Sequence, residues 1–540
     1  MIEKLIENWL DSASERSYQP VFVQILTARG YRVVHSTRHT VLEYGKDVLA
    51  IAPDGSGCAF QLKGNPGGRM GLNEFRRDIQ PQLIQLISQP VVSPGFPSAS
   101  HKSFLVSNGY FEEEVQRAVD DLNQGPYMSN IALISRGKLI CWCQDIGTSL
   151  WPSELNDDRL LLELYLTNPK DVLPVGKLSR LIRKVLKLNS EDDRLSGKPE
   201  FNRVVSSAAL LVGITTSGFA EADNHFAVVS AWTLFAVNII AAGEKHGFEL
   251  NGIALESLEL AESATCDALA QLWYEVEKRS HLVEGDGLTD TEVYSWRITL
   301  LLGLLSCLAI MDETTPCLDE ENRESLRQWL LQENKDKKLW GEGAVANLAP
   351  WLIWRRKNDP TLRPDKDILS LVNTVIAISQ SNSESHLVNP YYTFEELIRF
   401  NNNLDKVGEA SPIKGESFKG SSYTAEALFH LLVRTNFKQH CKLLWSDFTK
   451  ISHRSCLPDN SWEYCLLKID SGIDISKIYP STYKWDDIKD EALNCENEYI
   501  PEQLLLRPWL LALWWQVAPF RYNTEASKSF INGFMPEWRY

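Results

Sequence analysis

The segment DVLAIAPDGSGCAFQLK, residues 47–63, contains two short apolar runs separated by PDGSG. Runs of this length are typical of strands, and Asp-Gly between two of them is a strong signal for a hairpin. The sequence therefore predicts a β-hairpin that turns around residues 54–56. In such a hairpin we expect Asp47 to lie roughly opposite Lys63, and Gln61 to point the same way as Lys63, because side chains alternate along a strand.

Patterns on both sides of this hairpin predict further elements. The expected order is a helix at 18–29, a strand at 31–37, the hairpin, a helix at 72–88, a strand at 103–107, a helix at 111–123, a strand at 130–135 and a helix at 137–146. Strands that are separated by helices are joined by crossovers and run parallel. We therefore expect an α/β domain with a mixed sheet, ending near Trp151.

The rest of the chain is dominated by helical patterns. A chain of 540 residues exceeds what one hydrophobic core organises, so we expect domains at 1–151 (α/β), 152–400 (helical) and 401–540 (helical). Two apolar runs, Phe226–Gly243 and Ile298–Met311, are either interrupted by polar residues or too short to span a bilayer. They are predicted to be buried helices of a soluble protein, with no membrane contact.

Charge is unevenly distributed along the chain. Residues 1–150 carry 14 Lys and Arg against 15 Asp and Glu, so nearly all of the formal net charge of -16 belongs to later residues. Basic residues exceed acidic ones between Arg29 and Arg77, and contacts to nucleic-acid phosphates need such an excess. Within this region we expect Arg69, Arg76 and Arg77 to contact DNA.

The three polar residues of the hairpin match the needs of phosphodiester hydrolysis. A hard cation such as Mg²⁺ or Mn²⁺ prefers carboxylate and carbonyl oxygens, which Asp47 and Gln61 offer. Lys63 supplies a positive charge that can position water or stabilise negative charge developing on phosphorus. Taken singly, these residues would suit a surface ion pair and a polar strand residue; their combination favours a nuclease site.

The same residues resemble a known family. YGKD at 44–47 followed by a strand, a turn and a strand ending in QLK is similar to the G-x-D and Q-x-K pattern of Mrr-type restriction endonucleases within the PD-(D/E)XK superfamily. The segments ARGYRVV, FLVSNGYF and NIALISRGKLICW resemble the remainder of such a core, αβββαβ, over roughly the first 150 residues. The resemblance implies a metal-dependent DNA endonuclease, often serving defence against phage or plasmid DNA, with Asp47 and Gln61 as metal ligands and Lys63 as the catalytic lysine.

The chain departs from this family at the first core helix. Such enzymes usually bring a glutamate from that helix, and the matching position holds Gln19. Glu15 lies one turn earlier on the same helical face and is a possible substitute, as is Glu43, shortly before Asp47.

We therefore predict a cytoplasmic nuclease effector whose helical region senses a trigger, binds a protein partner, self-associates or keeps the enzyme inactive until it is needed. The acidic start of the chain, without an apolar signal segment, is the basis for the cytoplasmic location. The alternative is a non-catalytic interaction protein that uses a degenerate nuclease fold as a docking platform. Gln19 favours this alternative, whereas the intact Asp47, Gln61 and Lys63 oppose it.

Overall fold

The structure is a computed structural model that describes residues 2–36, 46–91, 95–97, 101–124, 131–147, 155–189, 193–279, 291–332, 337–359, 361, 365–380, 420–467, 473–494 and 499–534. The chain forms two compact units, Met1–Ala268 and Leu269–Tyr540, and helices predominate in both. The predicted domain boundaries, after Trp151 and after residue 400, lie outside the described residues.

The first unit begins with the predicted α/β region. Its elements are α1 (Ile2–Ser12), α2 (Glu15–Ala28), β1 (Arg32–Ser36), β2 (Val48–Ile51), β3 (Gly57–Lys63), β4 (Arg69–Met70), α3 (Leu72–Glu74), a π-helical turn (Phe75–Ile79), α4 (Gln80–Ser88), β5 (Lys102–Ser107), β6 (Tyr110–Phe111), α5 (Glu113–Gln124), β7 (Ile131–Ile134) and α6 (Arg136–Ile146). The predicted order of major helices and strands is confirmed. Whether it represents a restriction-endonuclease core stays a prediction.

The main sheet of this unit is mixed. Its strand order is β1-β2-β3-β5-β7, with the first three strands antiparallel and β3, β5 and β7 parallel. The parallel pairs follow from the intervening helices, which carry the chain back along the sheet. This arrangement brings the ends of β3 and β5 together at one edge, where Lys63 pairs in register with Ser107.

The hairpin of β2 and β3 forms as predicted, but its register differs from the expected one. Val48 pairs with Phe60, which puts Asp47 opposite Gln61, and the prediction that Asp47 lies opposite Lys63 was wrong. The loop runs from Ala52, whose N–H donates to Ser56 O, and it is centred on Asp54, one residue earlier than we expected. Asp54 closes the loop by accepting from the Ser56 N–H and hydroxyl.

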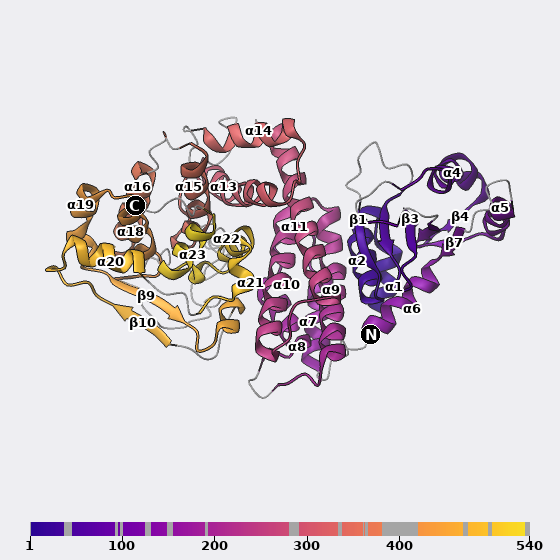
Figure 1. The fold of residues 1–540 in the computed structure, drawn as a ribbon, viewed down its shortest axis with the longest axis horizontal. Helices are drawn as coiled ribbons and strands as arrows, with labels where there is room; N and C mark the ends of the chain where they lie inside the picture. The colour runs from indigo at the N-terminus through magenta and orange to yellow at the C-terminus, as the bar shows by residue number, and fades with distance from the viewer. Residues whose placement is uncertain are drawn as a thin grey trace. The chain divides into compact units, whose positions relative to one another are not determined.

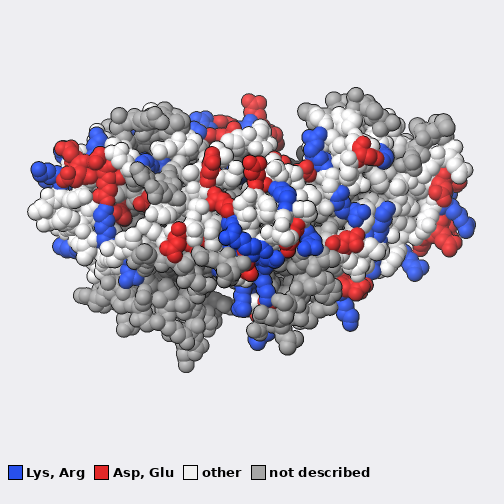
Figure 2. Space-filling view, turned by 60° about the horizontal axis from the view of Figure 1, so that its bottom comes forward, with Lys and Arg blue, Asp and Glu red and all other residues white. Residues whose placement is uncertain are grey.

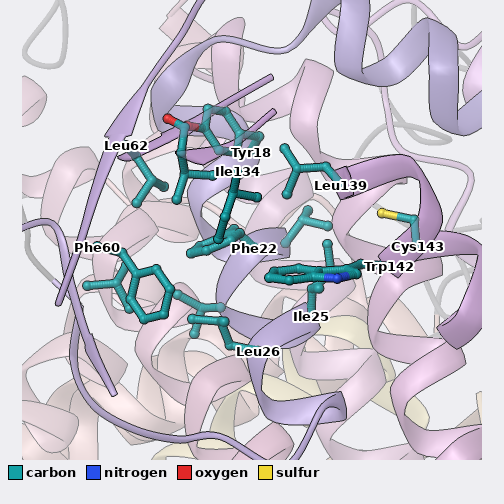
Figure 3. Packing of buried hydrophobic residues seen from close by; sticks show 14 of the residues in the cluster. Tyr18, Phe22, Ile25, Leu26, Phe60, Leu62, Ile134, Leu139, Trp142 and Cys143 are labelled. Atoms are coloured by element: carbon teal, nitrogen blue, oxygen red, sulfur yellow. The ribbon is translucent and has the colours of Figure 1, made fainter. Parts of the chain in front are cut away.

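Two apolar layers hold helices against the faces of the sheet. Even-numbered residues of β2 and β3, such as Phe60, face a cluster with α1, α2 and α6, whereas odd-numbered residues, such as Ala59, face α4 and α5. Figure 3 shows the first layer, in which the Phe22 ring of α2 lies edge-on to Phe60 at 5.5 Å between centroids. The alternation follows from the twofold period of strand side chains.

Some predicted bounds shift for local reasons. Helix α2 starts three residues earlier than expected, because the Ser14 side chain caps it by accepting from the Ser17 N–H. The predicted helix 72–88 is interrupted by the π-helical turn just before Pro81, which lies at the start of α4, where a missing N–H is tolerated. Phe111, predicted to begin a helix, belongs instead to the short strand β6.

Five further helices complete the first unit: α7 (Leu155–Tyr165), α8 (Val175–Val185), α9 (Lys198–Glu221), α10 (His225–His246) and α11 (Ile253–Lys278), the last of which continues across the division at Ala268. Helix α9 packs along α2, on the side away from the sheet (Figure 1). Leu210 of α9 belongs to the same apolar cluster as Phe22. The α/β region and these helices therefore share one core.

The second unit is helical, with one small sheet that the sequence analysis missed. Its helices are α13 (Thr291–Thr314), α14 (Glu320–Leu331), α15 (Val345–Asn358), α16 (Asp365–Gln380), α18 (Ala425–Arg434), α19 (Lys438–Phe448), α20 (Trp485–Asn494), α21 (Glu502–Leu505), α22 (Pro508–Val517), α23 (Thr524–Phe534) and the 3-10 turns Glu342–Ala344, Ser461–Cys465 and Pro519–Arg521. Strands β8 (Ser421–Ser422), β9 (Ser452–Leu457) and β10 (Ile473–Lys477) form the sheet, in the order β10-β9-β8. The two-residue β8 and the mostly polar β9 lack the apolar alternation that would predict them, whereas β10, IDISK, has Ile473 and Ile475 alternating with polar residues.

Within the described part of the chain, three helices are long and apolar enough to cross a membrane: Lys198–Glu221, His225–His246 and Ser295–Thr314. The most apolar window of the second is 94% buried inside the protein, and those of the other two are 78% buried. Burial of this extent accounts for their composition as core helices.

Candidate functional site

Asp47 and Gln61 form a buried pair at the open end of the hairpin. The Gln61 amide nitrogen Nε2 donates to Asp47 Oδ2 at 2.6 Å, and the Leu62 backbone N–H donates to the same oxygen at 2.5 Å. Asp47 is 9% exposed and Gln61 is 2% exposed. Their contact follows from the register of β2 and β3, which sets the two residues directly opposite each other.

The carbonyl oxygen of this amide is left without a partner. Gln61 Oε1 is buried and accepts no hydrogen bond from any residue that the structure describes. An unsatisfied buried acceptor destabilises a protein by about 1–3 kcal/mol, and such groups in folded proteins call for a specific explanation. An amide oxygen cannot relieve this by taking up a proton at ordinary pH, so only a donor, a water molecule or a cation can satisfy it.

Lys63, at the end of β3, is joined to the first turn of α2. Its Nζ lies 3.7 Å from Glu15 Oε2, and the same oxygen accepts from the Gly64 N–H at 3.1 Å. The Lys63 and Glu15 side chains are 20% and 30% exposed, so this part of the site reaches solvent. Glu15 therefore lies beside the end of β3, and its role as a substitute for the usual glutamate stays a prediction.

Glycine at position 64 makes this approach possible. A Cβ atom there would lie 2.8 Å from Glu15 N and 3.1 Å from Glu15 Cβ, closer than real Cβ contacts. Since the nearest of these atoms is helix backbone, a larger residue would push the start of α2 away from β3. The close approach of Glu15 to Lys63 therefore depends on Gly64.

Tyr18 is part of the site, although no sequence motif singled it out. Its hydroxyl accepts from the Lys63 N–H at 3.1 Å and lies 3.3 Å from Lys63 O. Burial raises the pKa of Tyr18 well above its usual value, and the negative charges of Glu15 and Asp47 raise it further. Both carboxylates therefore act on one phenol, although Asp47 comes from the hairpin and Glu15 from α2. Its place on the apolar helix face gave no signal of this role.

Gln19 is held elsewhere. It is buried, and its Nε2 donates to Ser36 Oγ of β1 at 3.0 Å. Glu15 and Gln19 thus contact different strands, although they lie one turn apart. Glu43, the other candidate ligand, lies outside the described residues.

The loop after β3 is fixed by residues that follow β5. The Asn108 side chain accepts from the Asn65 N–H at 2.7 Å and donates to Leu10 O and Ala13 O. A Cβ at Gly109 would lie 2.4 Å from Asn65 O, so glycine is needed there as well. The sequence analysis did not single out Asn108 or Gly109, because their contacts arise only when β3 and β5 lie side by side.

The three arginines predicted to contact DNA are exposed. Arg69 belongs to β4, and Arg76 and Arg77 to the π-helical turn. The Arg77 guanidinium binds its neighbour Asp78, with Nε at 2.9 and 3.0 Å from the two carboxylate oxygens, so much of its charge is already neutralised.

Figure 2 shows basic and acidic side chains interspersed over the face that it presents, with a group of Lys and Arg near its middle. The net charge of -16 is therefore not a uniform negative field on that face.

Comparisons of the chain with protein-family models, with curated proteins and with solved structures gave no match. The chemistry of the site therefore rests on its own residues. These are a carboxylate, an amide with a free carbonyl oxygen, a lysine held by a second carboxylate, and a buried phenol.

This donor set fits a hard divalent cation in part. Asp47 and Gln61 supply the oxygen ligands that Mg²⁺ and Mn²⁺ prefer, and Gln61 Oε1 has no other partner among the described residues. As it stands, however, the amide presents its nitrogen to Asp47. Rotation of the Gln61 amide by half a turn would exchange nitrogen for oxygen and set two oxygens side by side, an arrangement that needs a cation between them.

Proposed function

We propose that Asp47, Gln61 and Lys63, supported by Glu15 and Tyr18, form the site of a metal-dependent endonuclease that hydrolyses DNA phosphodiester bonds. The observation that carries this proposal is the contact of the buried Asp47 carboxylate with the buried Gln61 amide, on the strand that ends in Lys63. The resemblance to Mrr-type PD-(D/E)XK nucleases supports the same conclusion. It also suggests defence against foreign DNA in the cytoplasm.

Each residue has a defined task in this proposal. Asp47 and Gln61 would hold Mg²⁺ or Mn²⁺, which when bound supplies a water of lowered pKa and neutralises charge on the phosphate. Lys63 places its ammonium group where negative charge develops in the transition state. Glu15 holds this ammonium at 3.7 Å and thereby limits its side-chain freedom, while Arg69 and Arg76 supply phosphate contacts.

A direct test is cleavage of plasmid DNA by the full-length protein with Mg²⁺ or Mn²⁺. We expect nicked and linear products with either ion and none after addition of EDTA. Single-stranded DNA and RNA of the same length would establish the preferred substrate. Cleavage that persists in EDTA would contradict the metal-dependent mechanism.

A second function is supported by a different observation. Asp47 Oδ2 already accepts two hydrogen bonds from the protein, and Gln19, in the place of the usual glutamate, is bound to Ser36. Both features suit a degenerate nuclease fold that serves as a docking platform for a protein partner or a second copy of the chain. Calorimetric titration with Mn²⁺ separates the two functions, because a docking platform would give no heat that depends on Asp47.

A further inference from the structure

Glu221, the last residue of α9, accepts hydrogen bonds from the start of α2. Glu221 Oε1 accepts from the Ser14 N–H at 2.6 Å and from the Ser17 hydroxyl at 2.7 Å. Beside it, Arg16 forms an exposed ion pair with Asp223 at 3.4 Å. The contacted residues belong to the start of the helix that carries Glu15 and Tyr18, although about 200 residues of chain separate the partners.

These contacts complete a capping box with a residue from another helix. In the usual arrangement, the N-cap side chain accepts from the N3 backbone N–H, and a Glu at N3 accepts from the N-cap N–H. Here Ser14 accepts from the Ser17 N–H, but position N3 holds Ser17 itself, which has no carboxylate. Glu221 supplies that carboxylate, and its charge also favours the positive end of the α2 dipole.

Close packing of α9 along α2 places Glu221 beside Ser14 and Ser17. A Cβ at Gly213 of α9 would lie 2.6 Å from Val21 Cγ2, so glycine lets the two helices approach at their middles. From this contact α9 continues forward to Glu221, whereas α2 leads back to Ser14, so the two helices are antiparallel. The Glu221 carboxylate therefore lies beside the N-cap residue Ser14.

A short path leads from Glu221 to the proposed catalytic lysine. Ser14 and Ser17 flank Glu15, and Glu15 contacts both Lys63 and the Gly64 N–H. We propose that Glu221 is a positioning residue: it fixes the first turn of α2 so that Glu15 holds Lys63 in place for the reaction. This inference rests on the proposed nuclease function, and it gives the helices after the α/β region a role in support of the site.

The test uses full-length variants and two readouts. Glu221→Ala removes the carboxylate, Glu221→Gln keeps an acceptor for Ser14 and Ser17, and Asp223→Asn is the matched control, which breaks only the exposed pair with Arg16. Cleavage is measured as kcat and KM. Amide hydrogen exchange without metal or DNA is followed in peptides covering 13–19, 60–66 and, as a remote reference, 131–134.

We expect Glu221→Ala to speed exchange in both 13–19 and 60–66 but not in 131–134. We expect it to lower kcat by on the order of tenfold to a hundredfold with little change in KM, because small displacements of a reacting group have effects of this size. Glu221→Gln should recover much of the loss, and Asp223→Asn should match the wild type.

Faster exchange confined to 13–19, with unchanged kcat, would overturn the inference and leave Glu221 as a helix cap only. If Glu221→Ala loosens every peptide, Ser17→Ala is used in its place, because it removes one of the two hydrogen bonds to Glu221. Unchanged exchange of 60–66 in Ser17→Ala would then overturn the inference. Cleavage that depends on Asp47 and Lys63 but not on Glu221 contradicts this inference alone. If the wild type cuts no DNA, the proposed function fails, and a response of 60–66 still supports the path from Glu221 to the end of β3.

Discussion

Two buried carboxylates, Asp47 in the first unit and Glu342 in the second, have similar surroundings. One oxygen of each collects hydrogen bonds from protein donors. Asp47 Oδ2 accepts from Gln61 Nε2 and the Leu62 N–H. Glu342 Oε1 accepts from the Tyr423 and Thr424 N–H groups at 2.7 and 2.6 Å, and from the Ser422 and Thr424 hydroxyls.

The two sites differ in how an unpaired oxygen can be satisfied. Glu342 Oε2 has no hydrogen-bond partner among the described residues, but it belongs to a carboxyl group whose pKa burial raises to about 7, so a proton can occupy it. At the other site the unpaired oxygen belongs to the amide of Gln61, which has no such option. In addition, Lys63 follows two residues later and reaches solvent.

This contrast indicates that burial of a carboxylate does not by itself identify a functional site. Glu342 ties the turn Glu342–Ala344 to the start of α18, and protonation removes its buried charge. At the Asp47 site, Gln61 Oε1 needs a donor or a cation, and no described residue supplies one. We therefore expect substitutions at the two carboxylates to affect different properties.

The largest expected effect is on cleavage. Asp47→Ala and Lys63→Ala should each lower the rate by about a hundredfold or more, because the first removes a metal ligand and the second removes the positive charge that stabilises the transition state. Glu342→Gln should cut plasmid at the wild-type rate. Circular dichroism and melting check the fold of each variant. Wild-type cleavage by either Asp47→Ala or Lys63→Ala would show that the site is assigned wrongly.

The next effect concerns stability and pH at Glu342. Burial raises its folded-state pKa from 4.5 to about 7, so the folded state binds the proton more tightly. Protonated Glu342 therefore contributes to the free energy of unfolding in full below about pH 4.5. This contribution, on the order of 3 kcal/mol in total, is lost as the pH rises through about 7. Urea unfolding at pH 5 and pH 8 should show a smaller pH dependence for Glu342→Gln than for the wild type. Equal pH dependence in both proteins would argue against a protonated Glu342.

Gly64→Val should damage the Asp47 site through its backbone. The added atoms meet Glu15 N at 2.8 Å, so we expect a loss of about 1–3 kcal/mol in stability together with reduced cleavage. Gly137→Ala, at a position with open space around it, is the control and should be neutral or stabilising by up to about 1 kcal/mol. Thermal unfolding and plasmid cleavage measure both. A fully active Gly64→Val variant would show that the approach of α2 to β3 is not required.

Gln61→Glu should strengthen metal binding while making the metal-free protein less stable. Two carboxylates side by side raise the pKa of one of them, so stability of the metal-free variant should fall with rising pH, by about 1–2 kcal/mol. Melting at pH 5.5 and pH 8, with and without Mn²⁺, tests this. If Mn²⁺ restores no stability at pH 8, residue 61 does not face the ion.

The smallest effect is expected at the exposed arginines. Arg76→Glu should weaken DNA binding and lower its salt dependence by about one phosphate contact. Adding Arg77→Glu should weaken binding further, because it replaces the Arg77–Asp78 pair by two carboxylates. Arg117→Glu, on the exposed face of α5, is the control of equal charge change. Unchanged binding by the Arg76→Glu variant would move the DNA contact to another surface.

Local patterns were enough to predict much of the first unit. The hairpin, the order of helices and strands and the apolar face of α2 follow from periodicities of two and 3.6 residues and from Asp-Gly, which act over a few neighbours. The same rules failed for β8 and β9, because β8 has two residues and β9 is mostly polar, and both are held by pairing with other segments. In β10 the alternation of Ile473 and Ile475 with polar residues was overlooked. The rules also placed the centre of the hairpin loop one residue too late, and therefore paired Asp47 with Lys63 instead of Gln61.

The sequence by itself determined which groups are available: Asp47, Gln61 and Lys63 on one hairpin, and Glu15 on the helix before it. Only the tertiary structure decided how they meet. Tyr18 joins the site because α2 lies across the end of β3, and Asn108 fixes the next loop because β5 lies beside β3. Glu221 reaches Ser14 only because α9 packs antiparallel to α2. Such contacts join residues far apart in the chain, whereas sequence patterns report the preferences of near neighbours.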